Sequence, residues 1–81
     1  MYYVYILKSS KNNRYYIGST RDFNKRLQEH NAGRTKGNKS YGPFYPVYRE
    51  EYESLSEARK REYYIKSQKS RKYIERLING A

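Results

Sequence analysis

Residues 2–19 read YYVYILKSSKNNRYYIGS, and this stretch decides the fold. Residues 2–7 are aromatic and β-branched, which is typical of a strand, and residues 15–18 have the same character. The segment 8–14 between them is polar and contains serine and asparagine, which favour tight turns. We therefore predict a β-hairpin over residues 2–19.

Both faces of the predicted hairpin are apolar. Successive side chains of a strand point to opposite faces. One face carries Tyr3, Tyr5 and Leu7, and the other carries Tyr2, Val4 and Ile6. Other parts of the chain must therefore cover both faces. Gly18, at the end of the second strand, is expected to permit a bend or a close approach.

Cap and turn residues delimit the elements that follow the hairpin. Asp22 is a candidate N-cap for a helix over residues 22–31, which stops at residues 32–33. Residues 33–46 are rich in glycine, proline and basic side chains, and they predict a long loop. Residues 47–52 then predict a third strand, one side of which carries charge.

Two helices are predicted in the C-terminal part of the chain. Ser54 or Ser56 can cap the first, which runs through about Ser67, and Ser54 with Glu57 fits a capping box. Ser70 can start the second helix, which has a clear apolar face.

Glu62 interrupts the apolar stripe that Ala58 and Ile65 form on the first of these helices. An ionised carboxylate that faces a core costs several kcal/mol unless it is paired or binds a cation. Glu62 is therefore either half of an ion pair, with Arg26 or Arg61 as its partner, or a ligand for a hard ion such as Mg²⁺.

His30 falls within the stripe of Phe23 and Leu27 that should face the sheet, and Arg26, four residues earlier, lies at the edge of this stripe. Arginine matches the planar pair of oxygens of a phosphate and cannot lose its charge. A lone histidine is more often a packing residue. Next to an inward arginine, however, His30 indicates a polar pocket under the helix.

Composition limits the possible functions. The chain has 81 residues, enough for one domain over 1–81, and its net charge of +10 favours a polyanion such as nucleic acid. The absence of cysteine excludes a disulfide scaffold and a thiolate site, and the single histidine excludes a multi-histidine zinc site. No apolar stretch is long enough to span a membrane and no signal peptide is visible, so we expect a cytoplasmic protein without membrane association.

The order of these residues resembles a known family. Tyr3-Val4-Tyr5, Tyr16-Ile17-Gly18, Arg26, His30 and Glu62 are similar to the motifs of the GIY-YIG nuclease superfamily, most closely of its small single-domain subfamily. The stretch 16–30, YIGSTRDFNKRLQEH, is the most specific part, and the resemblance covers nearly the whole chain. It implies an α+β fold with a three-stranded antiparallel sheet flanked by three helices.

The resemblance also implies an activity, the endonucleolytic cleavage of DNA with one divalent ion, Mg²⁺ or alternatively Mn²⁺. By position, Tyr5 and Tyr16 match the motif tyrosines, and Arg26 and His30 match the motif arginine and the frequent histidine. Glu62 matches the metal-binding glutamate.

The sequence departs from the family pattern at a few positions. Tyr3 stands where the first motif has glycine, and Ser19 stands where certain relatives have a lysine. An asparagine that some members carry after the glutamate helix has no clear counterpart.

Hydrolysis of a phosphodiester needs a nucleophilic water, neutralisation of charge on the phosphate and help for the departing alkoxide. We expect Glu62 to hold the metal and Arg26 to bind the developing charge. Tyr5 is expected to orient or deprotonate the water, which requires nearby positive charge to lower its pKa from about 10. Tyr16 and His30 are expected to position water or phosphate, or to relay a proton. Which group takes the first proton stays open.

Substrate binding is expected to rest on phosphate contacts. The candidate side chains are Arg34, Lys36, Lys39, Arg59, Lys60, Lys69, Arg71 and Lys72. Nothing resembles a base-reading helix, so we expect weak sequence specificity. Selectivity would then come from a protein partner or from substrate shape, as in DNA repair or recombination. The choice between DNA and RNA and the oligomeric state stay open.

Two other functions fit the sequence. One is a nucleic-acid-binding module with little or no cleavage activity, and the other is a protein-interaction domain in which Arg26 and Glu62 form only a buried ion pair. Cleavage that depends on Glu62 separates the nuclease from the binding module, and salt-dependent DNA binding separates both from the interaction domain.

Overall fold

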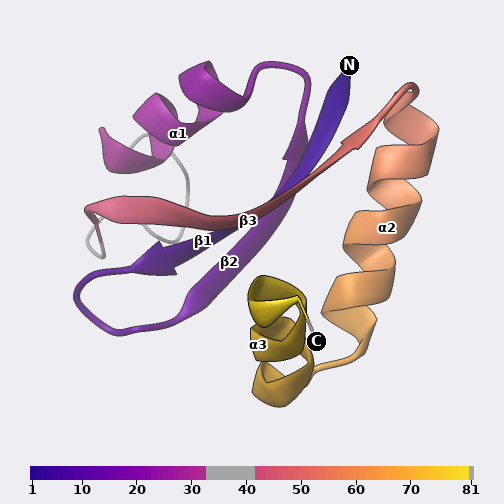
Figure 1. Cartoon of the computed structure of the whole chain (residues 1–81). Helices are drawn as coiled ribbons and strands as arrows, with labels where there is room; N and C mark the ends of the chain where they lie inside the picture. Colours follow the sequence, from indigo (N-terminus) through magenta and orange to yellow (C-terminus); the bar gives the residue numbers. More distant parts are fainter. Residues whose placement is uncertain (33–41, 81) are drawn as a thin grey trace.

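The computed structural model describes residues 1–32 and 42–80. Their elements, in chain order, are β1 (Tyr2–Ser9), β2 (Tyr15–Thr20), α1 (Phe23–Asn31), β3 (Phe44–Tyr52), α2 (Leu55–Ser67) and α3 (Arg71–Asn79) (Figure 1). The expected α+β fold with one antiparallel sheet and three helices is confirmed. Within the described ranges, no helix has the length and apolar character needed to cross a bilayer.

The sheet has the strand order β2-β1-β3, and both pairings are antiparallel. The predicted hairpin supplies β1 and β2, with Leu7 opposite Tyr16 and Tyr5 opposite Gly18. This register places Tyr5 and Tyr16 on the same face of the sheet. Because β1 lies in the centre, β2 and β3 are the two edges, and the edge formed by β2 is where the site lies.

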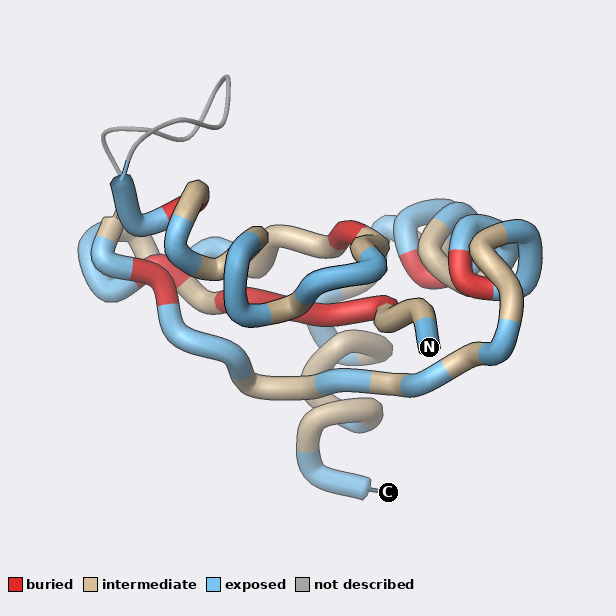
Figure 2. The backbone as a smooth tube through the Cα atoms, turned by 90° about the horizontal axis from the view of Figure 1, so that it is seen from above, coloured by how far each residue is buried: buried red, intermediate tan, exposed pale blue. Residues whose placement is uncertain are grey.

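The helices cover both faces of the sheet, as the two apolar faces of the hairpin require. Tyr5, Leu7 and Phe44 form one buried cluster, against which α1 packs Phe23 and Leu27. On the other face, Val4 of β1 packs with Ala58 and Ile65 of α2, and residues of α3 pack against this cluster. Figure 2 shows α1 and α3 on opposite sides of the sheet.

Each helix begins at a polar cap. Asp22, Ser54 and Ser70 each accept a hydrogen bond from the backbone N–H three residues further on. Asp22 and Ser70 act as expected, and Ser54 rather than Ser56 caps α2. These caps set the start of α1 and α2, and therefore the positions of the site residues along them.

The third strand starts earlier than predicted, at Phe44 instead of residue 47. The backbone N–H of Phe44 donates to Asn31 Oδ1 at 2.6 Å, which ties the beginning of β3 to the end of α1. Pro46 is accommodated because β3 is an edge strand, where a missing N–H leaves no gap in the ladder. The last three residues of the predicted loop over 33–46 therefore belong to β3, and residues 33–41 of it lie outside the described part of the chain.

Candidate active site at the edge of β2

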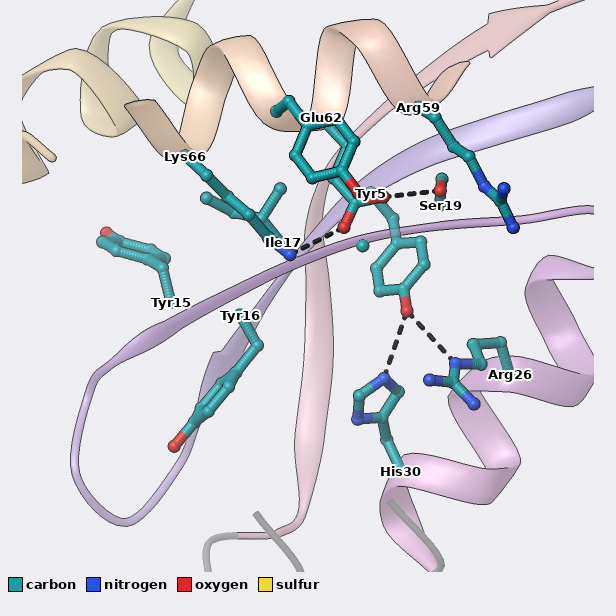
Figure 3. Close-up of a pocket in the computed structure, with 12 residues that line it drawn as sticks. Tyr5, Tyr15, Tyr16, Ile17, Ser19, Arg26, His30, Arg59, Glu62 and Lys66 are labelled. Carbon is teal, nitrogen blue, oxygen red and sulfur yellow. Dashed lines mark hydrogen bonds and ion pairs between the residues drawn. The ribbon is translucent and has the colours of Figure 1, made fainter. Parts of the chain in front are cut away.

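A pocket of about 780 Å³ opens along β2, between α1 on one face of the sheet and α2 on the other (Figure 3). It brings together every residue that the sequence indicated as catalytic. Its lining is Tyr5, Tyr15, Tyr16, Ile17, Gly18, Ser19, Arg26, His30, Arg59, Glu62, Tyr63 and Lys66. The pocket exists because β2 is an edge strand, around which two helices on opposite faces can approach each other.

Tyr5 is the most buried of the polar groups in the pocket, with 3% of its surface exposed. Its hydroxyl accepts a hydrogen bond from Arg26 Nε at 3.4 Å and lies 3.2 Å from His30 Nε2. Since Arg26 can only donate, we assign the phenol O–H as the donor to a neutral His30. Both partners come from α1, where a spacing of four residues places them on one side of the helix.

Burial controls the protonation of this pair. Burial raises the pKa of Tyr5, and the hydrogen bond and charge of Arg26 only partly oppose the shift. The expectation that neighbouring positive charge lowers this pKa is therefore wrong. Burial also lowers the pKa of His30, and the charge of Arg26 adds to that effect. Near pH 7, Tyr5 is a neutral phenol and His30 a neutral imidazole.

Gly18 allows the Tyr5 ring to reach this position. A Cβ atom at residue 18 would lie 2.6 Å from Tyr5 Cζ, closer than atoms approach without a shift. The close approach expected at this glycine is thus an approach of the Tyr5 side chain. Gly18 and Tyr5, which belong to two separate motifs in the sequence, therefore pack directly against each other.

Glu62 faces the pocket from α2 and is nearly buried, with 16% of its side chain exposed. Its Oε1 accepts from Ser19 Oγ at 2.5 Å, and its Oε2 accepts from Lys66 Nζ at 2.7 Å. The ion-pair partners that we expected, Arg26 and Arg61, are not the ones used. Arg26 pairs with Glu29, and Arg61 has a partner on β3.

Ser19 and Lys66 were not predicted as site residues. Lys66 follows Glu62 by four residues on a helix, a spacing at which an acid and a lysine commonly pair, so this signal was available. Ser19 had no such signal, because its contact joins residues 43 positions apart.

Tyr16 lines the pocket but takes no part in the hydrogen bonds around Tyr5 that the structure records. Its ring packs edge-on against Phe44 with centroids 5.1 Å apart, and its hydroxyl accepts from Asn12 Nδ2 at 3.4 Å. Figure 3 shows this hydroxyl directed away from Glu62.

The predicted phosphate-binding residues lie in different places. Arg59 lines the pocket one turn before Glu62. Arg71 lies over the ring of Tyr15, another pocket residue, at 4.6 Å. Lys60, Lys69 and Lys72 are exposed or half-buried on or near α2 and α3. Arg34, Lys36 and Lys39 lie outside the described residues.

The site suits a divalent ion that takes few of its ligands from the protein. The described part of the chain holds no cluster of three acidic, histidine or cysteine side chains, so an all-protein metal cage is not available there. Mg²⁺ is commonly bound by one or two carboxylates together with water and substrate phosphates. The single Glu62 carboxylate, at the wall of an open pocket, suits that arrangement.

A family model described as the GIY-YIG catalytic domain matches residues 1–74, and the chain belongs to this family. A domain of this family implies nuclease activity and a nucleic-acid substrate. The family expected from the sequence is confirmed.

Relatives of similar size match over almost their whole length. The UPF0213 proteins of Staphylococcus aureus strains Mu3 and MW2 are each 44% identical over 78 residues, which cover 95% of this chain and 93% of the relative. The solution NMR structure of a UPF0213 protein from Bacillus halodurans is similar with a TM-score of 0.62 and 34% identity. The matched region covers 98% of this chain and 84% of the Bacillus halodurans chain.

Proposed function

We propose that this protein is a divalent-metal-dependent endonuclease that hydrolyses DNA phosphodiester bonds in the cytoplasm. We propose further that it has little sequence specificity and selects substrates by shape, as in repair or recombination. The observation that carries the proposal is the convergence of Arg26, the Tyr5–His30 pair and Glu62 on one pocket. These groups supply an anion-binding cation, a proton acceptor and a metal ligand.

Arg26 is the group that would bind the scissile phosphate. Its guanidinium is held by the Tyr5 hydroxyl and by Glu29, each at 3.4 Å, and 40% of its side chain remains exposed at the pocket. Arginine stays charged at every relevant pH, and its planar donors match two oxygens of a phosphate. Charge that develops on those oxygens during attack would therefore be stabilised.

Tyr5 and His30 form a proton relay. A phenol with a raised pKa is a poor base by itself, but its O–H points to a neutral imidazole nitrogen. As water attacks, its proton can pass to the Tyr5 oxygen while the Tyr5 proton passes to His30 Nε2. Tyr5 is then neutral before and after the step, and His30 is the final acceptor.

Glu62 would hold the metal against the substrate. A divalent ion bound there supplies charge neutralisation at the phosphate and stabilises the departing oxygen. Ser19 holds the carboxylate in a fixed orientation, and Lys66 keeps a positive charge beside it. Arg59, on the same side of α2, is placed to contact a neighbouring phosphate.

The test is the nicking of supercoiled plasmid by the purified protein with Mg²⁺ or Mn²⁺, compared with the variant Glu62→Gln. The matched control is Glu53→Gln, which removes an exposed carboxylate before α2. We expect the wild type and Glu53→Gln to nick DNA, and Glu62→Gln to lose cleavage while it still binds DNA. Equal trace activity in all three proteins would refute the proposal.

One observation favours a second candidate function, a nucleic-acid-binding module without cleavage. Both carboxylate oxygens of Glu62 already have partners, and a metal at this carboxylate has to compete with the positive charge of Lys66. In that case DNA binding would remain salt-dependent, and added Mg²⁺ or Mn²⁺ would produce no cleavage of any DNA structure tested.

A further inference from the structure

A second pocket, of about 410 Å³, lies on the face of the sheet that α1 covers. Its lining is Tyr3, Arg21, Asp22, Phe23, Asn24 and Arg49. This volume falls within the range of about 300–1,000 Å³ that is typical of small-molecule sites. None of these residues belongs to the active-site pocket, and the sequence singled out none of them for binding.

Arg49, on β3, lines this pocket. Its guanidinium carbon lies 5.0 Å from the ring centroid of Tyr3 and 5.2 Å from that of Phe23, so two rings hold its plane. About half of its side chain, 47%, remains exposed. The partner Glu51 is 4.0 Å away and also half exposed, so this ion pair contributes little. The result is a flat, half-exposed cation that packs on two aromatic rings.

The second pocket is connected to the active site. A third depression between them, of about 340 Å³, shares Ser19 and Arg26 with the active-site pocket. It shares Arg21 and Asp22 with the second pocket and adds Thr20, Lys25 and Glu29. The carboxylate of Asp22 is engaged as the cap of α1. Arg21 and Lys25 therefore line a path from Arg26 along the β2–α1 connection to Arg49, and the one further carboxylate on it, Glu29, is paired with Arg26.

We propose that the Arg49 pocket binds an unpaired nucleobase of the substrate, next to the phosphodiester held at Arg26. Nucleobases stack on arginine planes and aromatic rings when their faces are free. A base within a duplex is already covered by its neighbours, so only an unpaired nucleotide can enter. The exposed amide of Asn24 offers both a donor and an acceptor to the edge of that base.

This inference rests on the proposed function and names its substrate class: DNA with an unpaired nucleotide close to the cleaved bond. Arg21 and Lys25 would hold the backbone between the two sites. A general phosphate site would need only charge, whereas this pocket adds a flat surface supported by two rings.

The test measures the binding of fluorescein-labelled DNA by anisotropy without divalent metal, so that cleavage does not interfere. The probes are a blunt duplex and the same duplex with a short single-stranded overhang. We expect the wild type to prefer the overhang at least about fivefold, the lower end of measured stacking effects. Arg49→Lys keeps the charge but removes the plane, so it should abolish the preference because binding of the overhang probe falls to the level of the blunt duplex.

Two further variants complete the design. Arg49→Gln should lose the preference and also bind the blunt duplex less tightly. Arg76→Gln removes an exposed arginine from α3, on the opposite side of the sheet, and should keep the preference. Thermal melting confirms that each variant is folded.

The outcomes separate the two proposals. A wild type without preference, or an Arg49→Lys variant that keeps it, would overturn the nucleobase site alone. Equal losses on both probes in Arg49→Lys would also overturn it, because Arg49 would then be a phosphate contact. A wild type that binds no DNA would overturn the proposed function as well, and failure of the plasmid-nicking test would leave the binding preference intact.

Discussion

Tyr5 and Gly18 show how one residue depends on another that sequence motifs treat separately. The Tyr5 ring crosses the backbone of β2 at the one residue without a side chain, and this lets its hydroxyl reach Arg26 and His30. A Cβ atom at residue 18 would force this buried ring to shift. The relay that we propose therefore depends on the absence of a side chain at residue 18.

We predict that Gly18→Ala lowers the cleavage rate at least about 100-fold, the lower end of what general acid–base groups contribute. It should also destabilise the fold by about 1–3 kcal/mol, because the added Cβ overpacks against Tyr5. Plasmid nicking and urea unfolding measure the two effects. Full activity at unchanged stability would show that the ring contact is unimportant.

Lys66 is the second residue whose role can be tested alone. Its ammonium group donates to Glu62 Oε2 and places a positive charge where the proposed metal would bind. We predict that Lys66→Met strengthens the binding of Mn²⁺ several-fold, measured by titration with paramagnetic-resonance detection of free ion. Lys60→Met, on the same helix, is the control and should bind Mn²⁺ like the wild type. Weaker binding in Lys66→Met would mean that the lysine orients Glu62 for the metal instead of competing with it.

At the scale of elements, the position of α2 relative to β3 depends on one polar cluster. Arg61 on α2 donates to both oxygens of Glu50 on β3, at 3.0 and 3.3 Å from Nε. Tyr48 and Tyr52 on the same strand also donate to Glu50. Because Glu62 follows Arg61 directly, this cluster helps to fix the position of Glu62, the proposed metal ligand.

The same cluster makes stability depend on pH. Burial alone would raise the pKa of Glu50, but hydrogen bonds from Arg61, Tyr48 and Tyr52 outweigh it and lower the pKa. Conversely, burial and the hydrogen bond to Glu50 raise the pKa of Tyr52 to about 12. A carboxyl with a lowered folded pKa contributes stability above its unfolded value, about 4.3, and this is lost as the pH falls through the folded pKa.

We therefore predict that Glu50→Gln loses about 1–3 kcal/mol of unfolding free energy at pH 7, the usual cost of removing charged hydrogen bonds. The difference from the wild type should shrink below pH 4, where Glu50 becomes protonated. Urea unfolding at pH 7 and pH 3 measures both values. A difference that is the same at both pH values would contradict the assignment.

At the scale of the whole molecule, a small fold carries a net charge of +10. Arg26, Arg59 and Lys66 bring part of this positive charge to the lining of the pocket. Such a molecule should bind DNA chiefly by releasing counterions from phosphates. Binding of that kind has a measurable signature, which a protein-interaction domain would lack.

We predict that the logarithm of the DNA association constant falls linearly with the logarithm of salt concentration. Each phosphate contact contributes about 0.9 to the slope on duplex DNA. Arg59→Gln should reduce the slope by about 1, and Arg76→Gln, distant from the pocket, should leave it unchanged. Binding that does not change with salt would favour the interaction domain over both nucleic-acid hypotheses.

Much of the fold could be predicted from the sequence because its signals are local. Asp22, Ser54 and Ser70 mark helix starts through hydrogen bonds that span three residues. The alternation along β1 assigned each side chain to its face. The start of β3 was missed because it depends on Asn31, thirteen residues earlier, and on the lack of a neighbour strand beside Pro46.

The sequence by itself determined the family, the order of elements, the basic character and the candidate catalytic residues that meet at the pocket, since each follows from local pattern or motif order. Only the tertiary structure decided which partners those residues have. In the structure, Glu62 accepts hydrogen bonds from Ser19 and Lys66, and Arg26 donates to Tyr5. Burial raises the pKa of Tyr5 instead of lowering it. Periodicity assigns a side chain to a face of its own element, whereas partners and burial depend on how α1 and α2 meet around the edge of β2.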